Sequence, residues 1–143
     1  MYDGNRYVEN KIKGRLGELA VTQDLIINDY VVFEEVTDTS KIDLVAYKDE
    51  KFYRIQVKSV CKKNNNAYYF NTIKKNGDKH WYKNGELDLW ACYGIEDDCV
   101  AWLNEEEALS KNGWVFRNEP SKNNQTKNVK YFKDFSLSRI LET

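Results

Sequence analysis

The sequence predicts a single α/β domain with a mixed central sheet flanked by helices. Apolar residues recur at steps of three and four between residues 8 and 27, which is the spacing of an amphipathic helix. Several short runs rich in β-branched and aromatic residues follow, each bounded by polar turns, as is typical of strands. A chain of 143 residues is about one domain's worth and can bury one core, so we assign residues 1–143 to one domain.

The expected elements follow from this pattern in chain order. The helix spans Val8–Ile27 and ends at a polar Asn-Asp pair. Strands are then expected at 30–36, 42–47, 52–60, 67–73, 87–95, 99–103 and 114–117. Asn104 is suited to cap a short helix, because three glutamates follow it in the first turn. The remaining stretches are two loops and a weak closing element, at 74–85, 119–128 and 131–141.

Composition places the chain among folded proteins. Hydrophobic residues make up 41% and charged residues 31%, a balance that disordered chains lack. No apolar run approaches the length of a membrane span, and the N-terminus lacks the layout of a signal peptide, so we expect no membrane contact and a cytoplasmic location. Cys61, Cys92 and Cys99 are odd in number and show no C-x-x-C spacing, which favours reduced thiols over a disulfide framework or a zinc site.

Charge is distributed unevenly along the chain, although the formal net charge is only −1. Residues 48–83 hold ten Lys or Arg against three Asp or Glu, a net of +7, whereas residues 84–110 hold eight acids and no base. A basic segment of this kind can hold phosphates even when the whole protein is nearly neutral. Charge clusters are more often solvated loops than binding sites, so both interpretations stay open.

The hairpin of residues 41–59 brings together an acid, an amide and a lysine. Side chains alternate along a strand, so Gln56 and Lys58 share one face of the second hairpin strand, and Asp43 opens the first. Phosphodiester hydrolysis needs a hard cation that neutralises charge and lowers the pKa of an attacking water. Asp43 and Gln56 offer the oxygen ligands that Mg²⁺ prefers. Lys58, about 6.5–7 Å beyond Gln56, is within reach of the same site and suited to orient water or offset phosphate charge.

Each of these residues also has a structural interpretation. Asp43 can accept a hydrogen bond in the preceding turn, and Gln56 and Lys58 can form the solvated face of a half-buried sheet. Glu18 lies on the helix but off the centre of its apolar stripe, so the helical pattern does not aim it at the sheet. All four residues, in this order and at this spacing, favour a site over the structural alternatives.

At these residues the chain resembles the PD-(D/E)XK nuclease superfamily. The motifs are Glu18 in G-R-L-G-E-L-A on the helix, Ile42-Asp43 on the second strand and R-I-Q-V-K at 54–58 on the third. The chain is similar in particular to the small branch of group I intron homing endonucleases, in which Q-x-K replaces (D/E)-x-K. E-L-D-L-W-A at 86–91 also looks like that branch, and the resemblance covers roughly residues 11–103.

The resemblance implies an αβββ core of the restriction-endonuclease type and a metal-dependent endonuclease of the site-specific homing type, acting on double-stranded DNA. It implies that Glu18, Asp43, Gln56 and the Val57 carbonyl surround Mg²⁺ or Mn²⁺, and that Lys58 is the catalytic lysine. It also implies a homo-oligomer, dimer or tetramer, in which two sites meet the two DNA strands.

Three alternatives stay open. The chain is similar, at lower detail, to archaeal Holliday-junction resolvases, which would make it a structure-specific nuclease. Gln56 in place of an acid removes one negative charge from the metal site, so a catalytically degenerate DNA-binding module is also consistent with the motif. A protein-interaction domain whose basic loop meets an acidic partner is the third.

Six lysines in the basic segment are the candidates for phosphate contacts, because lysine gives affinity with little sequence information. They are Lys62, Lys63, Lys74, Lys75, Lys79 and Lys83. A solvated loop is the alternative for each of them. Trp90, Trp102 and Trp114 are expected in the core or at an interface rather than as stacking platforms for bases.

Overall fold

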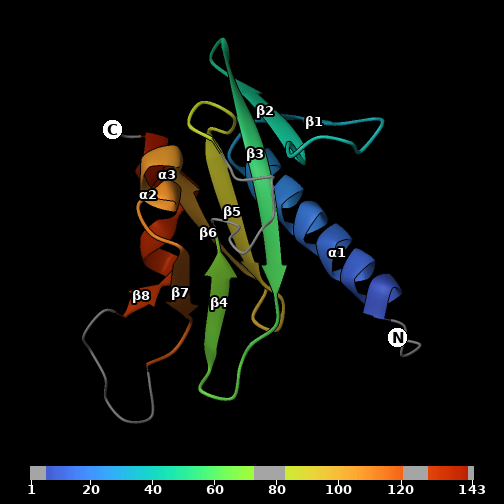
Figure 1. Ribbon diagram of the computed structural model, residues 1–143. Helices are drawn as coiled ribbons and strands as arrows, with labels where there is room; N and C mark the ends of the chain where they lie inside the picture. The colour runs from blue at the N-terminus through green and yellow to red at the C-terminus, as the bar shows by residue number, and fades with distance from the viewer. Residues whose placement is uncertain (1–5, 73–82, 121–128, 142–143) are drawn as a thin grey trace.

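The computed structural model describes residues 6–72, 83–120 and 129–141 (Figure 1). Its elements are α1 (Arg6–Ile27), β1 (Val31–Glu34), β2 (Leu44–Lys48), β3 (Lys51–Val60), β4 (Ala67–Asn71), β5 (Leu89–Gly94), β6 (Cys99–Asn104), α2 (Glu105–Leu109), β7 (Gly113–Arg117), β8 (Lys130–Tyr131), the 3-10 helix η1 (Phe132–Phe135) and α3 (Leu137–Leu141). The expected helix and all seven expected strands are therefore present, with bounds that differ by a few residues. None of the helices in these ranges is long and apolar enough to cross a membrane.

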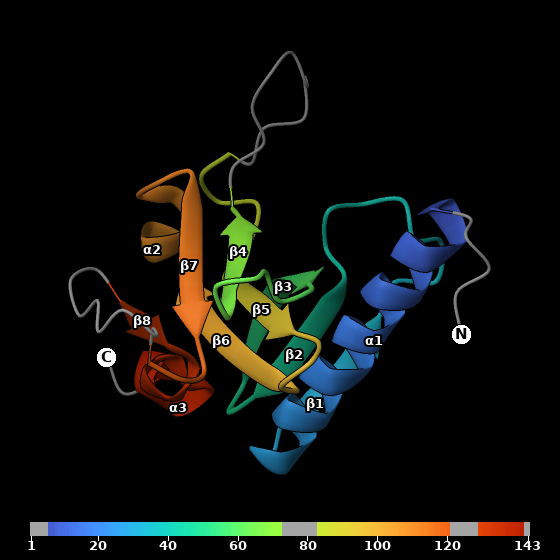
Figure 2. The same cartoon turned by 90° about the horizontal axis from the view of Figure 1, so that it is seen from below.

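The strands form two sheets instead of one. The larger sheet has the order β1-β2-β3-β5-β6, in which β3 and β5 run parallel and the other neighbours antiparallel. The prediction of a mixed central sheet, in which one helix is followed along the chain by three strands, is thus confirmed. β4, β7 and β8 form a second, three-stranded sheet beside it (Figure 2). The sequence did not predict this second sheet, because β4 pairs with β7 although β5 and β6 lie between them along the chain.

Two hydrophobic cores lie on the two faces of the larger sheet. The core beneath α1 is built mainly by Val21, Leu25, Leu44, Ala46, Ile55, Val57, Leu89, Ala91 and Trp102. The core beneath the second sheet is built mainly by Tyr68, Phe70, Trp90, Cys92, Leu103, Trp114 and Phe116. β5 lies between the two cores and is buried at every position. The expectation that Trp90, Trp102 and Trp114 are core residues is confirmed.

The β2–β3 hairpin has the two faces that the alternation predicts. Leu44 pairs in register with Ile55, and both side chains are fully buried beneath α1. Asp49 and Glu50 form the connecting turn with φ values of 51° and 66°, and two successive positive φ angles are what a type I′ hairpin turn requires. Gln56 is next to Ile55 and therefore points to the opposite face of β3.

A capping box begins α2, as the position of Asn104 predicts. The Asn104 side chain accepts a hydrogen bond from the Glu107 N–H at 2.8 Å, and the Glu107 carboxylate accepts one from the Asn104 N–H at 3.1 Å. Arg139 of α3 donates to both Glu107 oxygens and to the Trp102 carbonyl. The C-terminal helix is thereby fastened to β6 and α2.

Candidate active site

Asp43 sits where the chain enters β2, and its carboxylate is held by β3. Its N–H donates to the Ile55 carbonyl at 2.9 Å, which extends the β2–β3 ladder by one residue. The Oδ2 atom accepts two hydrogen bonds, from Gln56 Nε2 at 2.7 Å and from the Val57 N–H at 2.8 Å. These bonds fix the orientation of the carboxylate and engage one of its two oxygens. Oδ1 accepts neither of these hydrogen bonds and is the oxygen that remains available to bind a ligand.

Glu18 reaches the same place because α1 approaches β3 at a glycine. A Cβ atom on Gly17 would lie 1.9 Å from Ser59 Oγ and 3.1 Å from Val57 Cγ1. Only a residue without a side chain allows the helix to lie this close to the strand. Glu18, the next residue, then lines a groove together with Asp43. The helical pattern alone left the direction of Glu18 open.

The groove has a volume of about 460 Å³ and is strongly acidic. Its lining residues come from α1, from the last residue of β1 and from the segment between β1 and β2: Lys11, Gly14, Arg15, Glu18, Glu34, Glu35, Asp38 and Asp43. Arg15 partly balances the acids, with its Nη1 atom 2.7 Å from Glu34 Oε1 and 3.7 Å from Glu18 Oε2. Sequence reasoning missed Glu34, Glu35 and Asp38, because no motif marks the end of β1 or the loop that follows it.

Two of these acids, Asp43 and Glu18, are harder to ionise in the groove than in water. Burial raises the pKa of Asp43 above its ordinary 3.8, while the Val57 N–H and the Lys58 charge act in the opposite direction. Burial also raises the pKa of Glu18 above its ordinary 4.5, and the charge of Asp43 adds to the rise. Both carboxylates are less easily ionised than in water, and the charge of Asp43 disfavours ionisation of Glu18, so a cation is stabilising here.

Glu35 has a different part in the same groove. Its carboxylate accepts hydrogen bonds from the backbone N–H groups and the hydroxyls of Thr39 and Ser40 and from the Thr37 hydroxyl. These bonds, above all those from the two backbone N–H groups, lower the pKa of Glu35 to about 2. Glu35 therefore organises the loop that forms one wall of the groove.

Gln56 and Lys58 lie on β3, and Gln56 contacts Asp43. Gln56 directs its Nε2 donor to Asp43 and makes a longer contact of 3.4 Å to the Val57 carbonyl, so Oε1 is the one atom of its amide left to act as a ligand. Lys58 is two residues farther along the strand and pairs in register with Cys92 of β5. The charge of Lys58 lowers the pKa of Asp43.

The donor set suits a hard cation that keeps part of its water shell. Within the described ranges no three His, Cys, Asp or Glu side chains converge on one point, so no all-protein metal cage is built there. Asp43 and Glu18 supply two carboxylates, and Gln56 and the Val57 carbonyl supply neutral oxygens near them. Mg²⁺ is usually held by one or two carboxylates with several retained waters, so the residues fit this ion.

Two ion pairs hold the ends of the hairpin segment around Asp43. Lys41 Nζ lies 3.0 Å from Glu86 Oε2, and Arg54 binds both oxygens of Asp88 through its guanidinium group and one of them also through its backbone N–H. The acids of the E-L-D-L-W-A motif therefore position the segment that carries Asp43, rather than lining the groove themselves.

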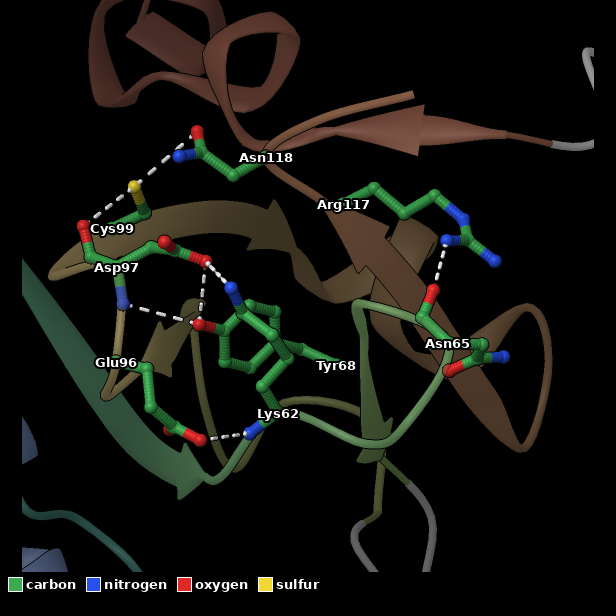
Figure 3. A network of polar contacts seen from close by, with 8 residues as sticks. All are labelled: Lys62, Asn65, Tyr68, Glu96, Asp97, Cys99, Arg117 and Asn118. Atoms are coloured by element: carbon green, nitrogen blue, oxygen red, sulfur yellow. Dashed lines mark hydrogen bonds and ion pairs between the residues drawn. The ribbon is translucent and has the colours of Figure 1, made fainter. Parts of the chain in front are cut away.

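Among the candidate phosphate contacts, Lys62 has an internal partner. Its Nζ lies 3.0 Å from Asp97 Oδ2, the atom to which the Tyr68 hydroxyl donates at 2.7 Å (Figure 3). The Lys62 N–H donates to Glu96, so this lysine joins the start of the second sheet to the β5–β6 turn. Lys63 and Lys83 are exposed. Lys74, Lys75 and Lys79 lie outside the described residues.

Comparison with known proteins shows the family to which this chain belongs. The family model of the PD-(D/E)XK endonucleases matches residues 8–138. Protein 5.3 of Escherichia phage T7 is 30% identical over 98 residues, which are 68% of this chain and 83% of that protein. The solved structure of the bacterial homing endonuclease I-Ssp6803I is similar with a TM-score of 0.71 at 15% identity, over 92% of this chain and 91% of that one, a likeness that shows the fold. The chain belongs to the PD-(D/E)XK endonuclease family.

Proposed function

We propose that this protein is a Mg²⁺- or Mn²⁺-dependent endonuclease that hydrolyses phosphodiester bonds in double-stranded DNA. The observation that carries the proposal is the Asp43 carboxylate, which is anchored through Oδ2 by Gln56 and Val57 and shares an acidic groove with Glu18. Membership of an endonuclease family gives the reaction class, and the oxygen donors near Asp43 support the proposal of a hard divalent ion.

Each residue of the site has a distinct task in this proposal. Asp43, Glu18, Gln56 and the Val57 carbonyl hold the metal ion, which when bound neutralises phosphate charge and lowers the pKa of an attacking water. Gln56 also holds Asp43 in place through its Nε2 donor. Lys58, whose charge lowers the pKa of Asp43, would orient the water or stabilise charge on the phosphate. Lys63, Lys74, Lys75, Lys79 and Lys83 are the proposed phosphate contacts, with Lys62 in a mainly structural position.

We further propose a site-specific, homing-type nuclease that works as a homo-oligomer. The structural likeness to a homing endonuclease supports this choice over a junction resolvase. A catalytically degenerate DNA-binding module is the second candidate, because Gln56 provides an amide where an acid would add charge to the metal site.

The direct test is cleavage of supercoiled plasmid and of a four-way junction with Mg²⁺, with Mn²⁺ and with EDTA. We expect metal-dependent cutting that Lys58→Ala reduces by about 10²–10⁴-fold while the DNA affinity and the melting temperature stay near wild type. A preference for the junction would replace the homing assignment with a resolving one. Salt-sensitive binding without cutting, over a broad library of sequences, would support the degenerate module.

Metal binding is expected to depend on pH with a defined sign. The pKa values of Asp43 and Glu18 are raised in the folded protein, so without metal their contribution to stability is present at low pH and is lost as the pH rises through those values. Metal needs both groups ionised. The rise in melting temperature on adding Mg²⁺ should therefore grow as the pH rises through the two raised pKa values and level off above them.

Differential scanning fluorimetry at several pH values, with and without Mg²⁺, measures this effect. Asp43→Asn should remove the Mg²⁺-induced shift at every pH. A shift of equal size at all pH values, or one that persists in Asp43→Asn, would place the metal elsewhere.

A further inference from the structure

Exposed apolar side chains are concentrated around one edge of the larger sheet. Among the described residues, eight large hydrophobic side chains are exposed, and seven of them lie on α1 or on the segment from β1 to the start of β3. They are Leu19, Ile26, Ile27, Val31, Phe33, Val36 and Phe52, which are 48% to 99% exposed. A standard protein interface buries ~800 Å² on each partner, so a single contact can cover apolar side chains on both α1 and β1.

These side chains flank the edge on both faces of the sheet. Val31 and Phe33 alternate with Val32, which packs into the core beneath α1, so they point away from the helix. The Phe33 ring lies 6.4 Å from that of Phe52, which continues the apolar surface from β1 across to β3. On the other face, Leu19 and Ile26 are spaced seven residues apart and so share one side of α1, whereas Ile27 lines a groove with Val100 and Leu137.

The edge itself lacks the devices that keep soluble sheets apart. β1 is the terminal strand of the larger sheet, next to α1 in both views (Figures 1 and 2), and pairs only with β2 among the described strands. Its residues are Val-Val-Phe-Glu, with neither lysine nor proline to block pairing. Its single charge, on Glu34, is engaged by Arg15 at 2.7 Å. An open, apolar edge of this kind favours the addition of another strand.

We propose that β1 pairs antiparallel with β1 of a second copy, so that two protomers share one continuous sheet. A two-fold axis perpendicular to the sheet brings the α1 helices side by side on one face and the Val31–Phe33 surfaces together on the other. One contact thus covers apolar side chains on both faces, which a partner seated on a single face would not do. The two Glu34 side chains then lie at opposite ends of the shared ladder, so no like charges meet.

The arrangement has a consequence for cutting, and this step rests on the proposed function. The groove adjoins the Glu34 end of β1. The two-fold axis places the two grooves at opposite ends of the shared ladder, on the same face of the extended sheet. A four-residue strand is about 13 Å long, so the two sites are separated by at least that distance. Two such sites are arranged to act on the two strands of one duplex.

Sedimentation velocity of the full chain over roughly 1–100 μM tests the interface. We expect a dimer, or a larger even assembly, whose dissociation constant rises at least about tenfold in Phe33→Lys on β1 and also in Ile26→Lys on α1. Tyr69→Lys is the matched control, because Tyr69 is the eighth exposed residue, at 45%, and lies on β4 of the other sheet. Circular dichroism establishes that each variant is folded.

A wild-type monomer over the whole range would overturn the interface. So would an assembly that ignores either Phe33→Lys or Ile26→Lys, or one that Tyr69→Lys weakens equally. Cleavage assays separate this proposal from the nuclease proposal. Lys58→Ala should stay dimeric, whereas Phe33→Lys should still nick supercoiled plasmid and yield less linear product. If a monomer cuts DNA, the interface proposal is wrong and the nuclease proposal stands. If the protein forms a dimer that never cuts, the nuclease proposal is wrong and the interface proposal stands.

Discussion

Asp43→Asn is expected to abolish metal-dependent cleavage, by at least about 10³-fold, without loss of folding. The amide oxygen of asparagine can accept the hydrogen bonds that Gln56 Nε2 and the Val57 N–H now donate to Oδ2. Oδ1, which accepts neither of these bonds, becomes an NH₂ group, however, and this group is a donor that cannot bind a cation. The change is therefore confined to the proposed ligand atom.

Stability should respond to Asp43→Asn in the opposite direction from activity. Burial raises the pKa of Asp43, so the ionised carboxylate is disfavoured in the folded protein at neutral pH. A neutral side chain removes this penalty, and the metal-free melting temperature should stay equal or rise. Asp49→Asn is the matched control, because Asp49 lies in the β2–β3 turn at φ 51°, where asparagine is well tolerated. A variant at Asp43 that cuts within tenfold of wild type would exclude this residue as the metal ligand.

Local pattern was enough to predict most of the fold. The turn at Asp49 and Glu50 and the alternation of Leu44 and Ile55 are properties of a few neighbouring residues, and the structure confirms them. The second sheet was not predictable in this way. β4 reads as a strand, but nothing within its five residues states that its partner is β7 rather than the central sheet.

The residues of the candidate site also fall into those that local pattern predicts and those that it does not. The sequence brought Asp43, Gln56 and Lys58 together because a hairpin holds them within one local unit. Glu35 and Asp38 enter the groove only through the path of the β1–β2 loop, and Lys62 meets Asp97 only because the β5–β6 turn folds back on the start of the second sheet. Such contacts between distant segments depend on packing, which no short pattern encodes.

The position of Glu18 depends on Gly17, and replacing this glycine is the change with the largest expected effect on packing. Gly17→Ala adds a Cβ atom that would lie 1.9 Å from Ser59 Oγ, so the Ser59 side chain must rotate or α1 must move. We expect a loss of about 1–3 kcal/mol from overpacking, offset in part by the ~1 kcal/mol by which alanine exceeds glycine in helix propensity. Cleavage should fall further, by about 10–10²-fold, because a shift of α1 displaces Glu18.

Two further variants isolate the contact with Ser59. Gly14→Ala is the same change one turn earlier in α1, where an added Cβ meets nothing within 4 Å, and it should stabilise the protein by about 0.5–1 kcal/mol. Ser59→Ala removes a buried hydroxyl that has no hydrogen-bond partner among the described residues, so it should be neutral or stabilising by itself. Combined with Gly17→Ala it should restore most of the lost stability, with a coupling energy of about 1–2 kcal/mol in chemical denaturation. If Gly17→Ala is as stable as Gly14→Ala, α1 does not depend on this close approach, and another feature of the fold must direct Glu18 into the groove.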